Sequence, residues 1–330
     1  MKGKFFYTLF ISIFSLCLLC LLGLGCSFIS ISLIPPVEPL KETTVSGSGK
    51  DKILIIDISG IISEEGKSSL VGLSGEPDIV TRIKEELKLA AKDKHIKAII
   101  LRINSPGGTV TAADIMYHEI EQFKEKTGIK VIACIMDLGA SGGYYVAVSA
   151  DKIIAHPTTV TGSIGVIMLN LSFEGLLQKI GVKDTSIKTG EYKDMGSPLK
   201  TMTEEERKIF QSVMNNLYER FMAVIAKNRK ELTPEKIRSL ADGRIYTAQQ
   251  ALELKLIDQI GYLDETIAQA KKDAGIEEAR VVIYHRPGTY KNNIYSQLSS
   301  SSFGAINLLN IDLKTFIRSG TPSFMYLWTP

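Results

Sequence analysis

The sequence AIILRINSPGG at residues 98–108 decides the fold class. Residues 98–103 are apolar apart from one arginine and rich in β-branched side chains, which is typical of a strand buried on both faces of a sheet. The strand ends in Pro-Gly-Gly, and a helical pattern follows directly, with an apolar face of Val110, Ala113, Tyr117 and Ile120. A strand, a glycine-rich turn and a helix in succession indicate a parallel α/β sheet with right-handed helical crossovers.

The same alternation surrounds this stretch. Residues 53–58 (ILIIDI), 130–136 (KVIACIM) and 164–169 (IGVIML) are short apolar runs that predict further strands. Between the first run and residue 98, an amphipathic pattern predicts a helix whose apolar face consists of Val80, Ile83, Leu87 and Ala90. Gly128 predicts the end of the helix that follows residue 108.

Beyond residue 169 the pattern becomes more helical. Thr203 and Glu206 form a capping box that opens a long helix, one side of which carries Phe210, Val213, Leu217, Phe221 and Val224. Two further helix starts are predicted at Thr233-Pro234 and at Thr247 with Gln250. We therefore expect one domain at residues 53–285 with a helical C-terminal extension, and a tail at 286–330 whose end is apolar.

The N-terminal segment, residues 1–36, predicts one transmembrane helix. Lys2 and Lys4 precede an uncharged run from residue 5 to residue 34, and two prolines end it. The run exceeds the roughly 20 residues that a spanning helix needs, and the preceding lysines predict a cytoplasmic N-terminus with the rest of the chain outside the cytoplasm. Two alternatives stay open: a signal peptide that is removed, and a lipoprotein signal with lipidation at Cys26.

Composition and cysteine use narrow the class of protein. The chain has 330 residues, with 39 basic and 36 acidic side chains, so it lacks the positive surplus of a dedicated nucleic-acid binder. Residues 37–52, polar and rich in serine and glycine, predict a linker. Cys134 is the one cysteine beyond the N-terminal segment and lies in an apolar run, which favours a packed core thiol over a nucleophile.

Two glycine-rich turns follow predicted strands and would meet at one edge of the sheet. In NSPGG (residues 104–108), glycines leave backbone N–H groups open beside a helix start, where they can hold an oxyanion. In GASGGYY (139–145), Ser141 lies at a strand-to-helix junction, and the Gly142 N–H can join the oxyanion donors. The alternative for NSPGG is a tight turn, and the alternative for Ser141 is a helix cap.

Several motifs in order extend this interpretation. TGSIGV (161–166), GEYKD (190–194) and ADGRIY (241–246) follow the two turns. Together the five motifs resemble the signal peptide peptidase A family, also called protease IV, over about residues 53–268. The resemblance implies a Clp protease/crotonase-like fold and a membrane-anchored serine endopeptidase that degrades released signal peptides at the membrane. It also implies Ser141 as nucleophile and Lys193 as base, while Gly108 and Gly142 are the candidate oxyanion donors.

A lysine can act as a base only in its neutral form. Lys193 must be neutral to accept the serine proton, which at pH 7 costs about 4.6 kcal/mol for an ordinary lysine, and burial can remove most of this cost. Among the histidines, His156 is the serious rival, but a structural role is favoured for it. No cysteine and histidine spacing fits a metal site, and the resemblance requires no cofactor.

The resemblance also implies an assembly. Single-module members form a dome-shaped ring, so we expect a homo-oligomer, an octamer whose sites take serine and lysine from adjacent protomers. Two other classes of protein remain as alternatives: an acyl-CoA enzyme of the crotonase type, and a non-catalytic membrane scaffold. In the first of these Ser141 would be dispensable.

Overall fold

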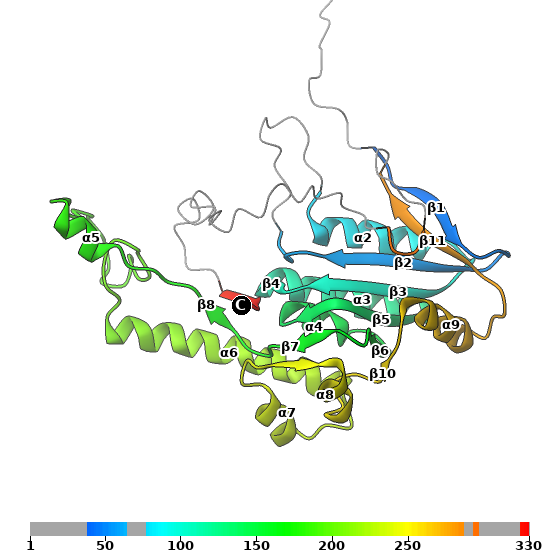
Figure 1. Ribbon diagram of the computed structural model, residues 1–330. Helices are drawn as coiled ribbons and strands as arrows, with labels where there is room; N and C mark the ends of the chain where they lie inside the picture. The colour runs from blue at the N-terminus through cyan, green and yellow to red at the C-terminus, as the bar shows by residue number, and fades with distance from the viewer. Residues whose placement is uncertain (1–37, 65–76, 287–292, 297–323, 330) are drawn as a thin grey trace, which may run out of the picture. The chain divides into compact units, whose positions relative to one another are not determined.

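Four parallel strands form the centre of the sheet: β2 (Lys52–Ser59), β3 (Ile96–Ser105), β5 (Lys130–Ala140) and β6 (Lys152–Ala155). β3 lies between β2 and β5, with Leu101 opposite Ile56 on one side and Ala133 on the other. The computed structural model, drawn in Figure 1, describes residues 38–64, 77–286, 293–296 and 324–329. The predicted parallel α/β sheet is confirmed.

Five further strands complete the sheet, and two of them, β1 and β9, are antiparallel to the strand beside them. Its order is β1-β11-β2-β3-β5-β6-β10, in which β10 is Gln259–Ile260, and β7 and β9 join it beside β5. β1 (Lys41–Ser46) is antiparallel to β11 (Arg280–His285), and β7 (Val160–Gly162) is antiparallel to β9 (Ile245–Thr247). The sheet is therefore mixed, although β11, β10 and β7 are parallel to β2, β6 and β5.

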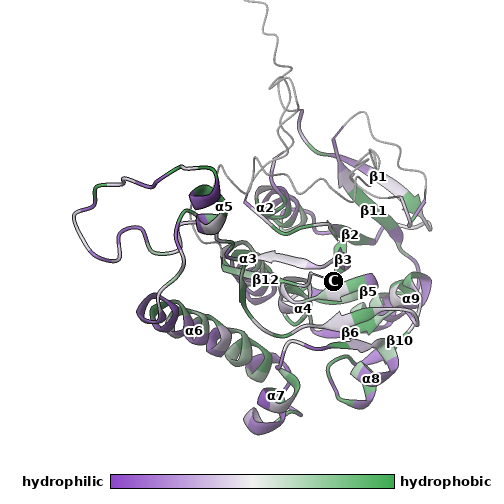
Figure 2. Ribbon diagram, turned by 60° about the vertical axis from the view of Figure 1, so that its left-hand side comes forward, coloured by the Kyte–Doolittle hydropathy of each residue, from purple (hydrophilic) through white to green (hydrophobic). Residues whose placement is uncertain are grey.

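Both faces of the central strands are buried. Leu54, Leu101 and Ala133 belong to a core shared with α2 (Ile79–Ala90), α3 (Val110–Thr127) and α4 (Gly142–Ala147). Their sequence neighbours on the opposite face pack against α9 (Leu263–Ala274). Because successive strand residues point to opposite faces, burial on both faces requires the nearly continuous apolar runs of the sequence. Figure 2 shows β5 largely in the green of hydrophobic residues.

The helix that follows the Pro-Gly-Gly turn has the expected boundaries. At its start the Thr109 side chain accepts a hydrogen bond from the Ala112 N–H. At its end Gly128 adopts a left-handed conformation with φ of 69° and donates its N–H to the Lys124 carbonyl. Glycine has no Cβ to clash in this region, so α3 ends where the sequence predicted.

The C-terminal part is helical, as predicted. Its elements are α5 (Glu174–Lys179), α6 (Glu204–Asn228), α7 (Pro234–Leu240), α8 (Ala248–Glu253), β10 (Gln259–Ile260) and α9. Capping boxes at Thr203 and Thr247 open α6 and α8, and Pro234 takes the first position of α7. On α6, Phe210, Phe221 and Val224 are buried, but Val213 is 39% exposed, so the apolar face is narrower than predicted.

Two segments predicted to lie outside the domain contribute strands. The predicted linker at 37–52 contains β1, in which the partly buried Thr43 and Val45 alternate with exposed residues. Thr43 lies opposite Ile283 of β11, and the pairing continues past a bulge at Val45. The predicted tail at 286–330 contains β12 (Phe324–Leu327). Of the strand predicted at 164–169, only β8 (Ile167–Met168) forms.

β12 belongs to a second, small sheet. It lies between β4 (Gly107–Thr109) and β8 and is antiparallel to both. Figure 1 shows this C-terminal strand in red beside β4 and β8. The end of the chain is thus brought to the Pro-Gly-Gly turn.

Over the residues that the structure describes, no helix is long and apolar enough to cross a membrane. The predicted anchor at residues 1–36 and the candidate lipidation site at Cys26 lie outside those residues.

Cys134 lies in the core, as predicted. Its side chain is buried on the α9 face of β5, and the Thr266 hydroxyl donates a hydrogen bond to its sulfur at 3.4 Å. Burial raises the pKa of the Cys134 thiol to about 11, which keeps it protonated and unreactive at neutral pH.

A cluster of charged side chains is buried beside β2. Arg102 donates to the Asp57 carboxylate at 2.8 Å, and Arg82 donates to Glu86 at 2.8 Å and to the Asp57 carbonyl. Glu86 is fully buried, and within the described part of the chain its second carboxylate oxygen has no hydrogen-bond partner. Burial raises the pKa of Glu86 to about 7, although the Arg82 guanidinium opposes the shift.

This burial predicts a pH-dependent stability. The folded pKa of Glu86 lies above the value of 4.5 expected when it is unfolded, so the unfolded state releases its proton first. The free energy of unfolding therefore falls as the pH rises from about 4.5 to 7. We expect Glu86→Gln to remove this part of the pH dependence and to be more stable than wild type at pH 8 by roughly 1 to 3 kcal/mol.

Urea denaturation at pH 5 and pH 8 measures this difference. Glu85→Gln is the matched control, because Glu85 neighbours Glu86 on α2 but is 45% exposed and pairs with Arg286. A Glu86→Gln variant that loses stability equally at both pH values would contradict the prediction.

Candidate active site

Ser141 lies at the junction between β5 and α4. It is 1% exposed, and its N–H donates to the Gly162 carbonyl at 2.7 Å. Its backbone has φ of 52° and ψ of −116°, a combination that residues with a Cβ rarely adopt. The side chain makes no capping hydrogen bond to α4, so the alternative of a helix cap does not describe it. The turn holds this serine in a strained conformation without using its hydroxyl for the helix.

The Pro-Gly-Gly turn touches the turn that contains Ser141. A Cβ on Gly107 would lie 2.6 Å from the Gly142 nitrogen, and a Cβ on Gly142 would lie 3.2 Å from the Gly108 nitrogen. Gly107 has φ of +100°, which also requires glycine. The structure therefore brings together Gly108, Gly142 and Ser141, three of the four residues that the sequence analysis proposed.

Two further residues hold the Pro-Gly-Gly turn in place. The buried Ser105 hydroxyl accepts a hydrogen bond from the Gly107 N–H at 3.1 Å and donates to the Gly60 carbonyl at 2.6 Å. The Ile62 N–H donates to the Gly107 carbonyl, and the Ile62 carbonyl accepts from the Thr109 N–H, each at 2.9 Å. With the N–H groups of Gly107 and Thr109 engaged on that side, the N–H of Gly108 is left to face β12.

β12 crosses the two turns as an extended strand. Tyr326 lies opposite Gly108, and the Trp328 N–H donates to the Pro106 carbonyl at 2.9 Å. A Cβ on Gly107 would lie 1.9 Å from the Tyr326 carbonyl oxygen, and one on Gly142 would lie 3.0 Å from it. The carbonyl of a bound strand thus lies where the two glycine turns meet, next to the serine. The sequence analysis did not identify Tyr326 as a residue near the site. The sequence feature that pointed to it was the apolar end of the predicted tail.

Lys193 lies apart from these residues. It is exposed in the segment of residues 169–203, and among the described residues no hydrogen bond or ion pair joins it to Ser141. The neighbouring carboxylate of Asp194 binds Lys188 and Lys200, at 2.8 and 2.7 Å. These two lysines hold the pKa of Asp194 at about 2, so its charge is engaged away from Lys193.

Comparison with known proteins places the chain in a family. The model of peptidase family S49 matches residues 123–277. An Enterococcus faecium protein named for signal peptide peptidase SppA is 38% identical over 76% of this chain and 72% of its own length. Serine protease SPPA, chloroplastic, of Arabidopsis thaliana is 34% identical over 78% of this chain and 38% of its own length. Protease 4 of Haemophilus influenzae is 33% identical over 67% of this chain and 35% of its own length.

The chain belongs to peptidase family S49. The resemblance to the signal peptide peptidase A family, predicted from the five motifs, is confirmed. The matched residues include Ser141, Gly142 and Lys193, whereas Gly108 precedes them. Family membership makes the chain a serine-type peptidase.

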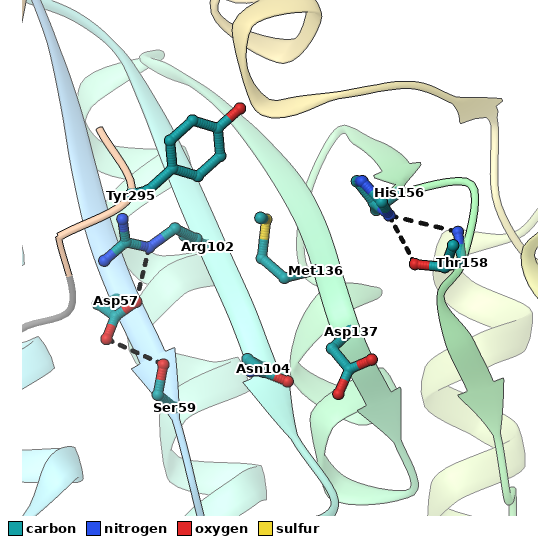
Figure 3. Close-up of a pocket in the computed structure, with 9 residues that line it drawn as sticks. All are labelled: Asp57, Ser59, Arg102, Asn104, Met136, Asp137, His156, Thr158 and Tyr295. Atoms are coloured by element: carbon teal, nitrogen blue, oxygen red, sulfur yellow. Dashed lines mark hydrogen bonds and ion pairs between the residues drawn. The ribbon is translucent and has the colours of Figure 1, made fainter. Parts of the chain in front are cut away.

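His156, the rival base, has other partners. Its Nδ1 lies 2.8 Å from the Thr158 hydroxyl, and its ring meets Tyr262 edge to face at 4.9 Å between centroids. It lines a cavity of about 300 Å³ that Figure 3 shows, with Asp57, Ser59, Arg102, Asn104, Met136, Asp137, Thr158 and Tyr295. Ser141 does not line this cavity, whose strand residues continue the face covered by α9. In the S49 chain, His156 therefore belongs to a different part of the sheet from the serine.

The strained backbone at Ser141 predicts an unusual mutational pattern. We expect Ser141→Gly to be more stable than Ser141→Ala by about 1 kcal/mol, because glycine adopts a positive φ without a Cβ penalty. Urea denaturation of the two variants measures the difference.

Ser149 provides the matched control. It is fully buried on the chain that follows α4 and does not have a positive φ. There Gly should be less stable than Ala, since glycine loses more backbone entropy on folding. The same order of stabilities at both serines would contradict strain at Ser141.

Proposed function

We propose that the chain is a membrane-anchored serine endopeptidase with a Ser141–Lys193 dyad that degrades signal peptides after their release from precursors. The observation that carries the proposal is the position of β12. A strand of the chain itself lies extended across the Pro-Gly-Gly turn, with the Tyr326 carbonyl where Gly108 and Gly142 meet beside Ser141. A substrate peptide in the same place would present its scissile carbonyl to the serine and to two backbone amides.

In the proposed reaction, the serine, the lysine and the two backbone amides each have one role. The Ser141 hydroxyl attacks the scissile carbonyl carbon while Lys193 accepts the hydroxyl proton. The amides of Gly108 and Gly142 stabilise the oxyanion, and a single donor of this kind is worth about 10² to 10³ in kcat. Lys193 then returns the proton to the leaving amine. Water hydrolyses the acyl-enzyme on Ser141 and frees the carboxyl product.

A second copy of the chain completes the site in this proposal. Lys193 is exposed within one chain, whereas a neutral lysine base needs a site from which water is excluded. The segment that carries it also exposes large apolar side chains, among them Leu176, Ile180 and Ile187. Figure 1 shows α5 of this segment standing apart from the sheet. Packing of this segment on a neighbouring protomer of a homo-oligomer, an octamer in our proposal, would bury both the apolar side chains and Lys193.

The substrate class and the location come from the relatives and from the N-terminal sequence. The Enterococcus faecium relative is named for a signal peptide peptidase, and an uncharged run of membrane-spanning length follows Lys4. An anchor there would hold an extracytoplasmic catalytic domain at the membrane, where released signal peptides remain. A binding groove for extended, apolar segments such as β12 fits such substrates.

Hydrolysis of a synthetic signal peptide tests the nucleophile. Wild type should cleave it, and Ser141→Ala should lower kcat by at least about 10³-fold, since only the oxyanion donors and binding remain. Mass spectrometry of the products locates the cleaved bonds. An acylating probe specific for nucleophilic serines should label wild type at Ser141. Equal turnover by both proteins would remove Ser141 from the chemistry.

A mixing experiment tests the shared site. Ser141→Ala and Lys193→Ala should each be inactive alone, yet regain activity when co-assembled, because one mixed interface then pairs an intact serine with an intact lysine. Lys183→Ala, which lies on the same exposed segment, is the control for damage to assembly and should stay active. If oligomers shown to contain both variants remain inactive, the dyad does not cross protomers.

A further inference from the structure

β5 contains a bulge near its carboxyl end. Ile135 of β5 lies opposite Ile103 of β3, but the next paired residues are Gly139 of β5 and Ser105 of β3. The β5 side therefore has three residues, 136–138, where β3 has one. A bulge of this kind holds two extra residues in one strand while the pairing continues beyond it.

The bulge determines which residue of β5 lies beside the Pro-Gly-Gly turn. A strand rises about 3.3 Å per residue, so without the two extra residues Ser141 would lie roughly 6 to 7 Å farther past the end of β3. Residue 139 would then reach the level of Gly107. As the chain is folded, a Cβ on Gly142 would lie only 3.1 Å from the Gly107 Cα. The two extra residues thus bring the serine and the Pro-Gly-Gly turn into register.

Side chains provide hydrogen bonds where the bulge interrupts the ladder. On the β3 side, the Leu138 N–H donates to Oδ1 of Asn104 at 3.1 Å. On the other side, the buried Thr159 hydroxyl donates to the Met136 carbonyl and, at 3.1 Å, to the Ile135 carbonyl. A buried backbone group without a partner is costly, so these bonds stabilise the bulge in this form.

β7 becomes the partner of β5 beyond the bulge. β6 pairs with β5 before the bulge, and β7 pairs with it from the last residue of the bulge onward. Thr161 of β7 lies opposite Gly139, and its fully buried hydroxyl donates to the Gly139 carbonyl at 2.6 Å. The next residue of β7, Gly162, accepts the Ser141 N–H. Thr161 therefore holds β5 two residues before the serine.

Gly139 fits the bulge because it has no side chain. A Cβ at this position would lie 2.5 Å from Cγ2 of Ile135, which is closer than two carbon atoms can pack. The bulge, the side chains that pair with it and this glycine therefore form one unit that ends at Ser141.

We infer that the bulge sets the position of the nucleophile, and that Asn104 and Thr161 are positioning residues for peptide hydrolysis. They act through the backbone of residues 138 and 139, not by contact with the reacting atoms. The inference rests on the proposed role of Ser141. A change in the bulge would move the serine hydroxyl relative to the two oxyanion amides, and a displacement of about 1 Å can lower a rate about a hundredfold.

Removal of one buried hydroxyl tests the inference. Thr161→Val keeps the shape of the side chain but takes this donor from the Gly139 carbonyl. We expect kcat and kcat/KM for a synthetic signal peptide to fall by the same factor, about tenfold to a hundredfold, because the change affects the transition state and not the binding of the peptide. Thr161→Ser keeps the hydroxyl and should recover most of the activity.

Thr266→Val is the matched control. Thr266 is also fully buried, and its hydroxyl contacts the same strand, but it donates to the Cys134 sulfur and not to the backbone of the bulge. This variant should keep the kcat of wild type. Wild-type kcat in Thr161→Val, or equal losses of kcat in Thr161→Val and Thr266→Val, would overturn the inference.

Hydrogen exchange keeps the inference separate from the proposed function. In Asn104→Ala the Leu138 N–H loses its acceptor, and we expect exchange at residues 138–143 to become about fivefold faster or more, relative to exchange in β2. Faster exchange across the whole turn supports the role of the bulge even if Ser141→Ala cleaves as fast as wild type, a result that would refute the proposed nucleophile. Faster exchange at Leu138 alone would refute the inference and leave the peptidase unaffected.

Discussion

The contact between two glycine turns is the constraint on which the candidate site depends. β3 and β5 are neighbours in a parallel sheet, so their carboxyl ends lie side by side, and the turns that follow them meet. A Cβ on Gly107 would collide with the Gly142 nitrogen, and a Cβ on Gly108 would lie 1.8 Å from the Ile62 carbonyl oxygen. The absence of side chains at these positions lets backbone amides converge beside Ser141. The neighbouring strands and the two hydrophobic cores hold the two turns in this contact.

The groups of the proposed reaction differ in how firmly the fold fixes their positions. Ser141 and the glycine turns are buried at the ends of central strands, and the strained φ of Ser141 persists because the Gly162 carbonyl and the neighbouring turn fix its backbone. Lys193 instead lies exposed on a segment rich in exposed apolar side chains. A preformed nucleophile and an exposed base are what an enzyme assembled from several copies would present in a single chain.

Sequence patterns predicted what local chemistry determines. The apolar runs, the caps at Thr203 and Thr247, the stop at Gly128 and the convergence of Gly108, Gly142 and Ser141 follow from burial on both faces, capping geometry and parallel strand order. β12 could not be predicted in this way, because its strand exists only through pairing with β4 and β8, far away in the sequence. β1 was missed for the same reason: its polar sequence resembles a linker until β11 lies beside it. In the proposed assembly, the position of Lys193 relative to a serine would depend on packing between chains, which a pattern within one chain does not contain.

Because β12 already lies on the two glycine turns, it competes with any peptide that binds there. β12 is covalently part of the chain whose glycine turns it covers, so it binds there at an effective concentration that does not fall on dilution. A peptide displaces β12 only if its concentration, weighted by its affinity for the site, exceeds the effective concentration of the strand, weighted in the same way. Short, weakly bound peptides would then be excluded in bulk solution. With the proposed membrane anchor, peptides concentrated in the plane of the membrane would reach the local density needed to displace the strand.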